Sequence, residues 1–291
     1  MTAARRSRRP CSPRPEAVRF EVARDDGSRD RRIDDPTNTW GVHLAGRVLL
    51  PWALRRGVSA NAVSVVGLVL GTAAAAAYWR WADPRWATLG FGLCVGWLVA
   101  DGLDGMIARA TGSASDLGRL LDGLCDHVVF VLLYVSLAAS IGTGGGWLLA
   151  VAAGAAHAVQ ASLFEGERMR FHRRVSGAVQ PEKVSDPGRP VLIRLYDAVA
   201  GAFDAAAEPF ERSMRASPDP AELGRGYGVR AVPPMRLMAL LTNNVRVIAF
   251  YLACLAGRPA LYWWFELGPL TLVAVAGIAW HRRVERGMRR A

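Results

Sequence analysis

Four aspartates lie within a stretch of 26 residues, in or beside long apolar runs: Asp101, Asp104, Asp122 and Asp126. The members of the first pair are three positions apart and those of the second pair four, so each pair shares one helix face. Between the pairs, the run TGSASDLG is rich in glycine, serine and threonine, which is typical of a turn. The spacing therefore predicts a helical hairpin whose two carboxylate pairs face each other.

Such a cluster of carboxylates favours a bound cation. A carboxylate at bilayer depth costs about 2.5–3.5 kcal/mol on insertion scales, and four carboxylates close together repel one another. Hard divalent ions with oxygen ligands, Mg²⁺ or Mn²⁺, are the natural occupants. The alternative is that these are solvated acids at helix ends beside a loop. That alternative suits one or two aspartates better than four at helical spacing.

The same stretch resembles the signature of the CDP-alcohol phosphotransferase family. The pattern D-x2-D-G-x2-A-R-x8-G-x3-D-x3-D agrees at eight positions, and chance rarely produces such a match. The eight matching residues are Asp101, Asp104, Gly105, Ala108, Arg109, Gly118, Asp122 and Asp126. A partial resemblance precedes them, where the family reads Thr-Pro-Asn-x-x-Thr and this chain reads SANAVS, with Ala60 in place of proline and Ser64 in place of the second threonine.

The resemblance implies a reaction and a role for each residue. A CDP-linked lipid such as CDP-diacylglycerol meets a small acceptor alcohol, a phosphodiester forms and CMP leaves, as in phospholipid biosynthesis. Asp101, Asp104 and Asp122 are then metal ligands, while Asp126 is the general base on the acceptor hydroxyl and a further metal ligand. The implied nucleotide-binding residues are Gly105, Ala108, Arg109, Gly118 and Asn61. Asn61 also fits the cap of the following helix.

The composition indicates a membrane protein with several spans. The chain has 291 residues, of which 52% are hydrophobic, and several apolar runs approach the roughly 20 residues that cross a bilayer. We expect an all-α polytopic membrane protein with six transmembrane helices, an N-terminal interfacial helix at 40–57 that contains Pro51, and a cytoplasmic helical insertion between helices 4 and 5. The expected spans lie at about 60–79, 86–108, 118–140, 147–165, 237–257 and 260–280.

The expected domain organisation follows from these spans. A disordered basic tail covers 1–39, the membrane domain covers 40–283, and a basic C-terminal tail covers 284–291. Residues 173–235 form the cytoplasmic insertion within the membrane domain. Within it, residues 191–215 have the periodicity of an amphipathic helix, which lies either on the membrane surface or over the mouth of the site.

The basic residues indicate an orientation. With six spans and the N-terminus inside, 32 of the 36 Lys and Arg residues lie on the inner side and three on the outer side. By the positive-inside rule, both termini and the aspartate hairpin are cytoplasmic, on the inner cell membrane. Although the net charge is +11, the basic residues cluster beside the apolar runs, so we expect anionic lipid headgroups rather than nucleic acid as partners.

One basic residue, Arg246, lies inside the expected fifth span. With Asn243 and Asn244 one turn before it, it either binds an acceptor phosphate bidentately or extends to the interface. Arg168 and Arg170 lie on the inner side after the fourth span and extend the positive surface. These residues favour a phosphate-bearing acceptor such as glycerol 3-phosphate or an inositol phosphate. A homodimer is implied by the resemblance alone.

Two other function classes fit part of the pattern. An intramembrane Mg-dependent prenyltransferase also uses aspartate-rich helices, but it carries two acidic motifs far apart in the chain and more spans. A cation transporter could use the aspartates as its ion site, but transporters usually show repeated halves with broken helices. The sequence shows neither feature, and a transporter has no need of the Ala108-Arg109 pair.

Overall fold

The computed structural model describes residues 30, 32–35, 37, 41–113, 116–179 and 205–290, with the backbone alone at 116–124 and 290. Over these residues the chain forms helices and no strand. The predicted all-α class is therefore confirmed.

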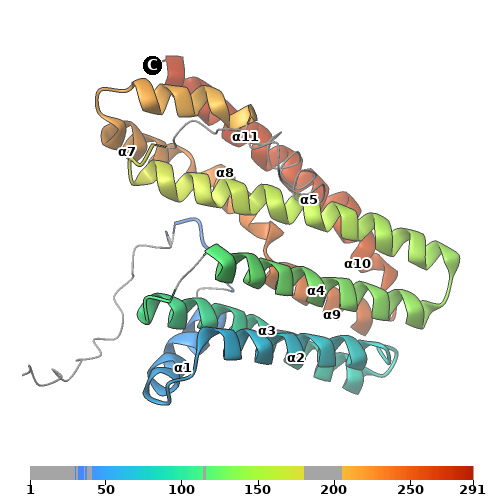
Figure 1. Cartoon of the computed structure of the whole chain (residues 1–291). Helices are drawn as coiled ribbons and strands as arrows, with labels where there is room; N and C mark the ends of the chain where they lie inside the picture. The colour runs from blue at the N-terminus through green and yellow to red at the C-terminus, as the bar shows by residue number, and fades with distance from the viewer. Residues whose placement is uncertain are drawn as a thin grey trace, which may run out of the picture.

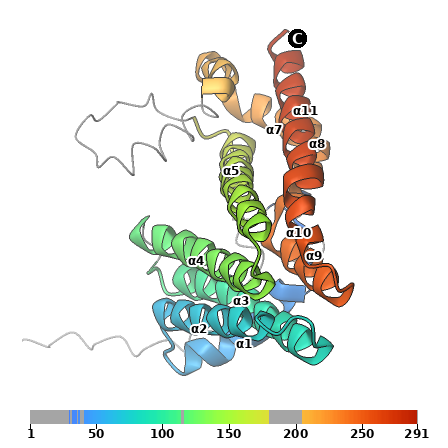
Figure 2. The ribbon, with the colours of Figure 1, turned by 90° about the vertical axis from the view of Figure 1, so that its right-hand side faces the viewer.

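The first four helices lie side by side in one layer (Figures 1 and 2). Local signals fix where two of them begin. The side chain of Ser59 caps α2 by accepting a hydrogen bond from the amide of Ala62 at 3.2 Å, and Asp83 caps α3 ahead of Pro84. The helices of this layer are α1 (His43–Arg55), α2 (Ala60–Tyr78), α3 (Pro84–Ala110) and α4 (Asp116–Ile141).

Two glycines let α2 approach its neighbours closely. A Cβ atom on Gly67 would lie 3.3 Å from the Cβ of Ala100 on α3, and one on Gly71 would lie 2.4 Å from a methyl group of Val129 on α4. Small residues four positions apart are a common device for close helix packing in membranes. They bring α2 against the two helices that carry the aspartates.

The remaining described helices pack against this layer as a second group (Figure 2). Some of their buried side chains form a core of the second group, while others, from α5, α9 and α10, share the core of the first layer. Two helices join the groups, because α5 packs on α4 and α9 packs on α3. The group contains α5 (Gly144–Val175), a helix over 205–216, α7 (Pro220–Arg230), α8 (Val232–Met238), η2 (Ala239–Leu241), α9 (Asn243–Leu255), α10 (Ala260–Phe265), η3 (Glu266–Leu270) and α11 (Thr271–Arg290).

Several helices are long and apolar enough to cross a bilayer. Among the described residues there are four, or five if α8 to η2 and the bent continuation α9 count as one span, with an angle of 43° between them. The expected number of six is not confirmed, although the apolar helix Cys125–Ile141 is a shorter candidate. Exposed aliphatic side chains, which suit contact with lipid, lie on these helices: Val65, Val66, Val69, Val131, Leu148, Val151, Leu272 and Val275.

A helix, α1, lies within the range expected for the interfacial helix. It contains Pro51 and exposes Leu44, Val48 and Trp52, as an amphipathic helix at a membrane surface would. Part of the expected N-terminal tail is also packed, because Ile33 and Asp35 are buried.

Three boundaries differ from the sequence prediction. First, α5 continues about ten residues beyond the expected end of the fourth span, because charged residues that favour helices pair at i,i+3 along it, as Glu165 does with Arg168. Second, the expected fifth span is interrupted at Thr242. Third, the expected basic tail from 284 continues α11 as far as Arg290.

The predicted amphipathic helix at 191–215 lies partly outside the described residues. Its described part belongs to the helix over 205–216, in which Phe210 is buried in the core of the second group. This helix and α7 lie beside the C-terminal ends of α5 and α11 (Figure 1).

Candidate active site

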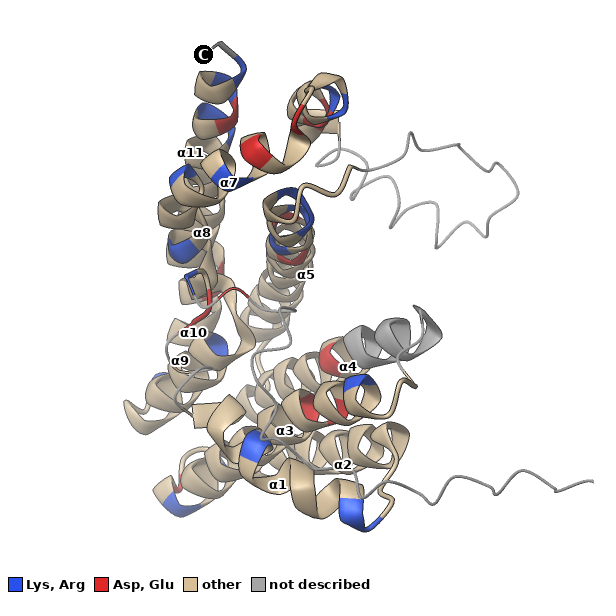
Figure 3. Ribbon diagram, turned by 90° about the vertical axis from the view of Figure 1, so that its left-hand side faces the viewer, with Lys and Arg blue, Asp and Glu red and all other residues tan. Residues whose placement is uncertain are grey.

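The predicted hairpin brings acidic residues of α3 and α4 into one small pocket. Asp101 and Asp104 come from the second half of α3, and Asp126 from α4. Figure 3 shows acidic residues in red on both α3 and α4. The residues lining the pocket are Ser64, Gly67, Leu68, Trp97, Asp101, Asp104, Cys125 and Asp126.

Two helices outside the hairpin hold the carboxylates by hydrogen bonds. On α2, the hydroxyl of Ser64 donates to Oδ2 of Asp104 at 2.5 Å, and Asp104 is 5% exposed. On α9, Nδ2 of Asn243 donates to Oδ2 of Asp126 at 2.9 Å. Sequence spacing could not predict these partners, because they lie 40 and 117 positions from the aspartates.

The remaining aspartate of the motif, Asp122, lies one helical turn before Asp126 on α4. The predictions for the side chain of Asp122 and for Gly118 lie outside the described residues. Three of the four predicted ligands thus have a described position, and these three share the pocket.

The predicted nucleotide-binding residues of α3 follow its aspartates toward the end of the helix. A Cβ atom on Gly105 would lie 3.3 Å from a terminal nitrogen of Arg109, so the guanidinium group of Arg109 lies beside the bare backbone of Gly105. Ala108 is half-buried and Arg109 is exposed. This end of α3 therefore offers a positive charge next to the acidic pocket.

Asn61 lies exposed in the first turn of α2. The alternative role of Asn61 as a helix cap is wrong, because the side chain of Ser59 makes the cap. Asn61 stands three residues before Ser64, and so on the same face of α2 as the pocket.

The three arginines predicted to bind the acceptor have different surroundings. Arg168 pairs with Glu165 at 2.9 Å and is 29% exposed, and the charges of Asp34 and Asp101 also act on it. Arg170 pairs with Glu167 at 2.6 Å and is almost fully buried. Of these two, Arg168 is the residue that combines exposure with an electrostatic link to the pocket.

Arg246 is fully buried and bonded through all three of its guanidinium nitrogens. Nε donates to Glu266 at 3.0 Å, one terminal nitrogen donates to Gln160 at 2.8 Å, and the other donates to the carbonyl of Leu241. Arg246 therefore does not extend to the interface, and these contacts give no support to its predicted role in acceptor binding.

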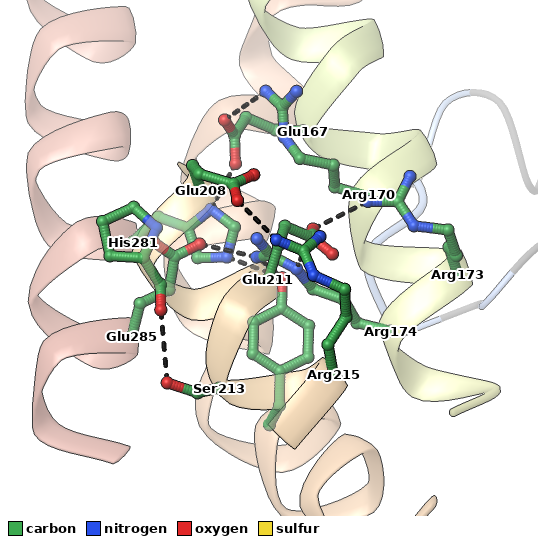
Figure 4. Close-up of polar contacts among 12 residues, drawn as sticks. Glu167, Arg170, Arg173, Arg174, Glu208, Glu211, Ser213, Arg215, His281 and Glu285 are labelled. Atoms are coloured by element: carbon green, nitrogen blue, oxygen red, sulfur yellow. Dashed lines mark hydrogen bonds and ion pairs between the residues drawn. The ribbon is translucent and has the colours of Figure 1, made fainter. Parts of the chain in front are cut away.

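A second cluster of charged residues lies at the ends of α5 and α11 (Figure 4). Glu167, His281 and Glu285 are of types that ligate metals, and one ligand atom of each lies within 4.8 Å of the others. Arginines already neutralise the charges of the two glutamates, since Arg174 donates to Glu285 at 2.6 Å and Arg282 donates to both glutamates. The positive charge that a metal ion would supply is thus already supplied by these arginines. The cluster is a buried network of ion pairs.

The same network fastens the inserted helices to α5. Glu211, from the helix over 205–216, accepts hydrogen bonds from Arg173 at 2.7 Å and from Arg174 at 2.9 Å. Tyr227, from α7, is hydrogen-bonded to His281 at 2.8 Å. Burial raises the pKa of Tyr227, so its hydroxyl stays protonated in this contact. The sequence gives no spacing signal for this network, whose members come from four separate helices.

The fold and the pocket define an integral membrane protein with an acidic site lined by three of its helices, α2, α3 and α4. Comparison with family models assigns the class more closely, because residues 58–187 match the CDP-alcohol phosphatidyltransferase model. The chain therefore carries a domain of this family, which spans α2 to α5 and includes every aspartate of the motif. None of the curated proteins and none of the solved structures compared gives a significant match.

Proteins that this family model describes transfer phosphatidyl groups from CDP-alcohols in general, and the family is generally dependent on a divalent metal. The described pocket fits such an ion, because Asp101, Asp104 and Asp126 place hard carboxylate oxygens around it.

Proposed function

We propose that this protein transfers a substituted phosphoryl group from a CDP-linked lipid, such as CDP-diacylglycerol, to a small acceptor alcohol, with release of CMP. The observation that carries the proposal is the convergence of Asp101, Asp104 and Asp126 on one pocket inside the family domain. A prenyltransferase or a cation transporter finds no such support, since the motif and the family match both belong to CDP-alcohol chemistry.

The carboxylates of the pocket have two tasks in this proposal. Asp101, Asp104, Asp122 and Asp126 hold Mg²⁺ or Mn²⁺, which neutralises the diphosphate and stabilises the leaving CMP. Ser64 orients the carboxylate of Asp104 through its hydrogen bond. Phosphoryl transfer depends mostly on such positioning and on charge neutralisation.

Asp126 acts as the general base. It takes the proton of the acceptor hydroxyl as the new P–O bond forms and the P–O bond to CMP breaks. Gly105 and Ala108 let the nucleotide approach the backbone of α3, with Gly118 on α4 and Asn61 on α2 near the same end of the hairpin, and Arg109 pairs with a phosphate.

The acceptor in this proposal bears a phosphate, as glycerol 3-phosphate and inositol phosphates do. Its binding residue is Arg168, because this partly exposed guanidinium group lies within the electrostatic reach of Asp101. The pocket opens to the cytoplasm, where CDP-linked substrates are made, and both termini lie on that side of the inner membrane.

The test supplies membranes that contain the protein with CDP-diacylglycerol and Mn²⁺, adds one acceptor at a time and measures CMP release. The panel comprises glycerol 3-phosphate, an inositol phosphate, inositol, serine, choline and ethanolamine. We expect CMP release with a phosphate-bearing acceptor and none after chelation of the metal. CMP release only with acceptors that lack a phosphate would contradict the proposed acceptor, and release with none of the acceptors would contradict the proposed function.

A further inference from the structure

The start of α9 reaches the acidic pocket from the opposite end of the chain. Asn243 is the first residue of this helix, and its Nδ2 donates to Oδ2 of Asp126 at 2.9 Å. An ionised carboxylate only accepts hydrogen bonds, so it is the NH₂ group of the amide that faces Asp126. The contact fixes one carboxylate oxygen without adding charge to the pocket.

The residues on either side of Asn243 are themselves held in place. The hydroxyl of Thr242 donates to Oδ2 of Asp35 at 2.8 Å, and Nδ2 of Asn244 donates to the hydroxyl of Thr37 at 3.1 Å. Asp35 is 6% exposed and also accepts from the hydroxyl of Thr37 at 2.7 Å. The described N-terminal residues thus clamp the start of α9 on both sides of Asn243.

Further contacts anchor these N-terminal residues. Ile33 is 2% exposed and belongs to the core of the second group. Nε of Arg236, on α8, donates to the carbonyl of Arg32 at 2.7 Å. The helical structure is also interrupted at Thr242, between η2 and α9. The break therefore presents Asn243 from a fixed helix end rather than from the middle of a span.

We propose that Asn243 is a positioning residue, which holds the carboxylate of Asp126 in the orientation that the acceptor hydroxyl requires. The inference rests on the proposed function, in which Asp126 is the base. A general base must lie within hydrogen-bond reach of its proton in a defined geometry, and a contact with a charged group is strong enough to enforce that geometry. Asn243 acts through Asp126 and touches no substrate in this role.

Kinetic measurements on three variants test the proposal. Asn243→Ala removes the donor, and we expect kcat to fall roughly ten- to hundredfold, as loss of a hydrogen bond to a charged group predicts, while KM for the CDP-lipid is unchanged. Asn243→Asp keeps the shape but opposes two carboxylates, so its kcat should be lower than that of the alanine variant. Leu252→Ala is the control on the same helix, because this side chain is 56% exposed and lies nine positions after Asn243.

The order of the variants separates positioning from a structural role. If Asn243 only filled space, the isosteric Asn243→Asp would be more active than Asn243→Ala. Equal loss of kcat in Asn243→Ala and Leu252→Ala would also overturn the proposal, and so would wild-type kcat in Asn243→Ala.

A cross-linking experiment makes the outcome independent of turnover. In a background without native cysteines, Asp126→Cys is combined with Asn243→Cys or with Asn244→Cys and treated with a short bifunctional thiol reagent. We expect cross-linking of the first pair and little of the second. If the first pair fails to cross-link, the inference is wrong. If it cross-links but the wild-type protein releases no CMP, the proposed function fails while the contact stands.

Discussion

Arg246 and Glu266 form an ion pair inside the helical bundle, with Nε and Oε1 3.0 Å apart and no exposed surface on either side chain. The hydroxyl of Tyr262 donates to the same carboxylate oxygen at 2.7 Å. Gln160, on α5, accepts from Arg246 and donates to the backbone carbonyl of Glu266 at 3.0 Å. A charge at membrane depth needs such partners, and here they join α9, η3 and α5.

We predict that Arg246→Ala destabilises the protein, because it leaves Glu266 buried without its cation. Breaking a buried pair in this way costs about 3–5 kcal/mol. The measurement is thermal unfolding of the purified protein in detergent, with Arg246→Met combined with Glu266→Leu as the control, which should recover part of the loss. Wild-type stability together with a raised KM for the acceptor alone would instead restore the acceptor-binding role.

Asp126→Asn should abolish CMP release while the CDP-lipid still binds. The asparagine has nearly the same shape but cannot take a proton, and loss of a general base typically costs about 10²–10⁴-fold in rate. Binding of a radiolabelled CDP-lipid and release of CMP are measured on the same preparation. Normal turnover in this variant would remove Asp126 from the mechanism.

Ser64→Ala should weaken the binding of the activating metal ion. Without the hydroxyl, the carboxylate of Asp104 loses the hydrogen bond that orients it, so we expect the Mn²⁺ concentration for half-maximal activity to rise roughly tenfold. Ser64→Thr keeps a hydroxyl and should stay close to the wild type. Equal behaviour of the alanine and threonine variants would argue against the contact.

Arg174→Met should release the inserted helices from α5. Arg174 is fully buried and bridges Glu211 and Glu285, so its loss leaves two buried carboxylates short of a cation. Limited proteolysis should then cut within 205–230 at lower protease concentration. Arg212→Ala is the control, since this arginine is 75% exposed and its ion pair with Glu208 lies at the surface.

The same network gives a test with a chelator. Because arginines already neutralise Glu167 and Glu285, EDTA should leave the proteolysis pattern of 205–230 unchanged. A pattern in EDTA like that of Arg174→Met would show that Glu167, His281 and Glu285 hold a metal.

Gly71→Ala should separate α2 from α4. The new methyl group would lie 2.4 Å from the side chain of Val129, and such overpacking typically costs about 1–3 kcal/mol. Val129→Ala in the same chain should restore most of the stability by making room. Gly154→Ala is the matched control, since nothing lies within 4 Å of a Cβ at that position, and its thermal unfolding should match the wild type.

The sequence by itself determined the class of fold and the core of the candidate site. Apolar runs close to the length of a bilayer predict transmembrane helices whatever their partners are, because the cost of burying polar groups in lipid is local to each run. The position of the aspartates of α3 and α4 is also predictable from local sequence. Helical periodicity places Asp101 with Asp104, and a short turn then brings Asp126 to the same pocket.

The tertiary structure alone decided the surroundings of these residues. Arg246, Arg168 and Arg170 look alike in the sequence, but Arg246 finds Glu266 after 20 residues, while Arg168 and Arg170 find glutamates three residues away. The contact of Asn243 with Asp126, and the clamp that holds Asn243, join segments up to 207 positions apart. Local spacing carries no record of such pairs, because they depend on how whole helices pack rather than on the period of any one helix.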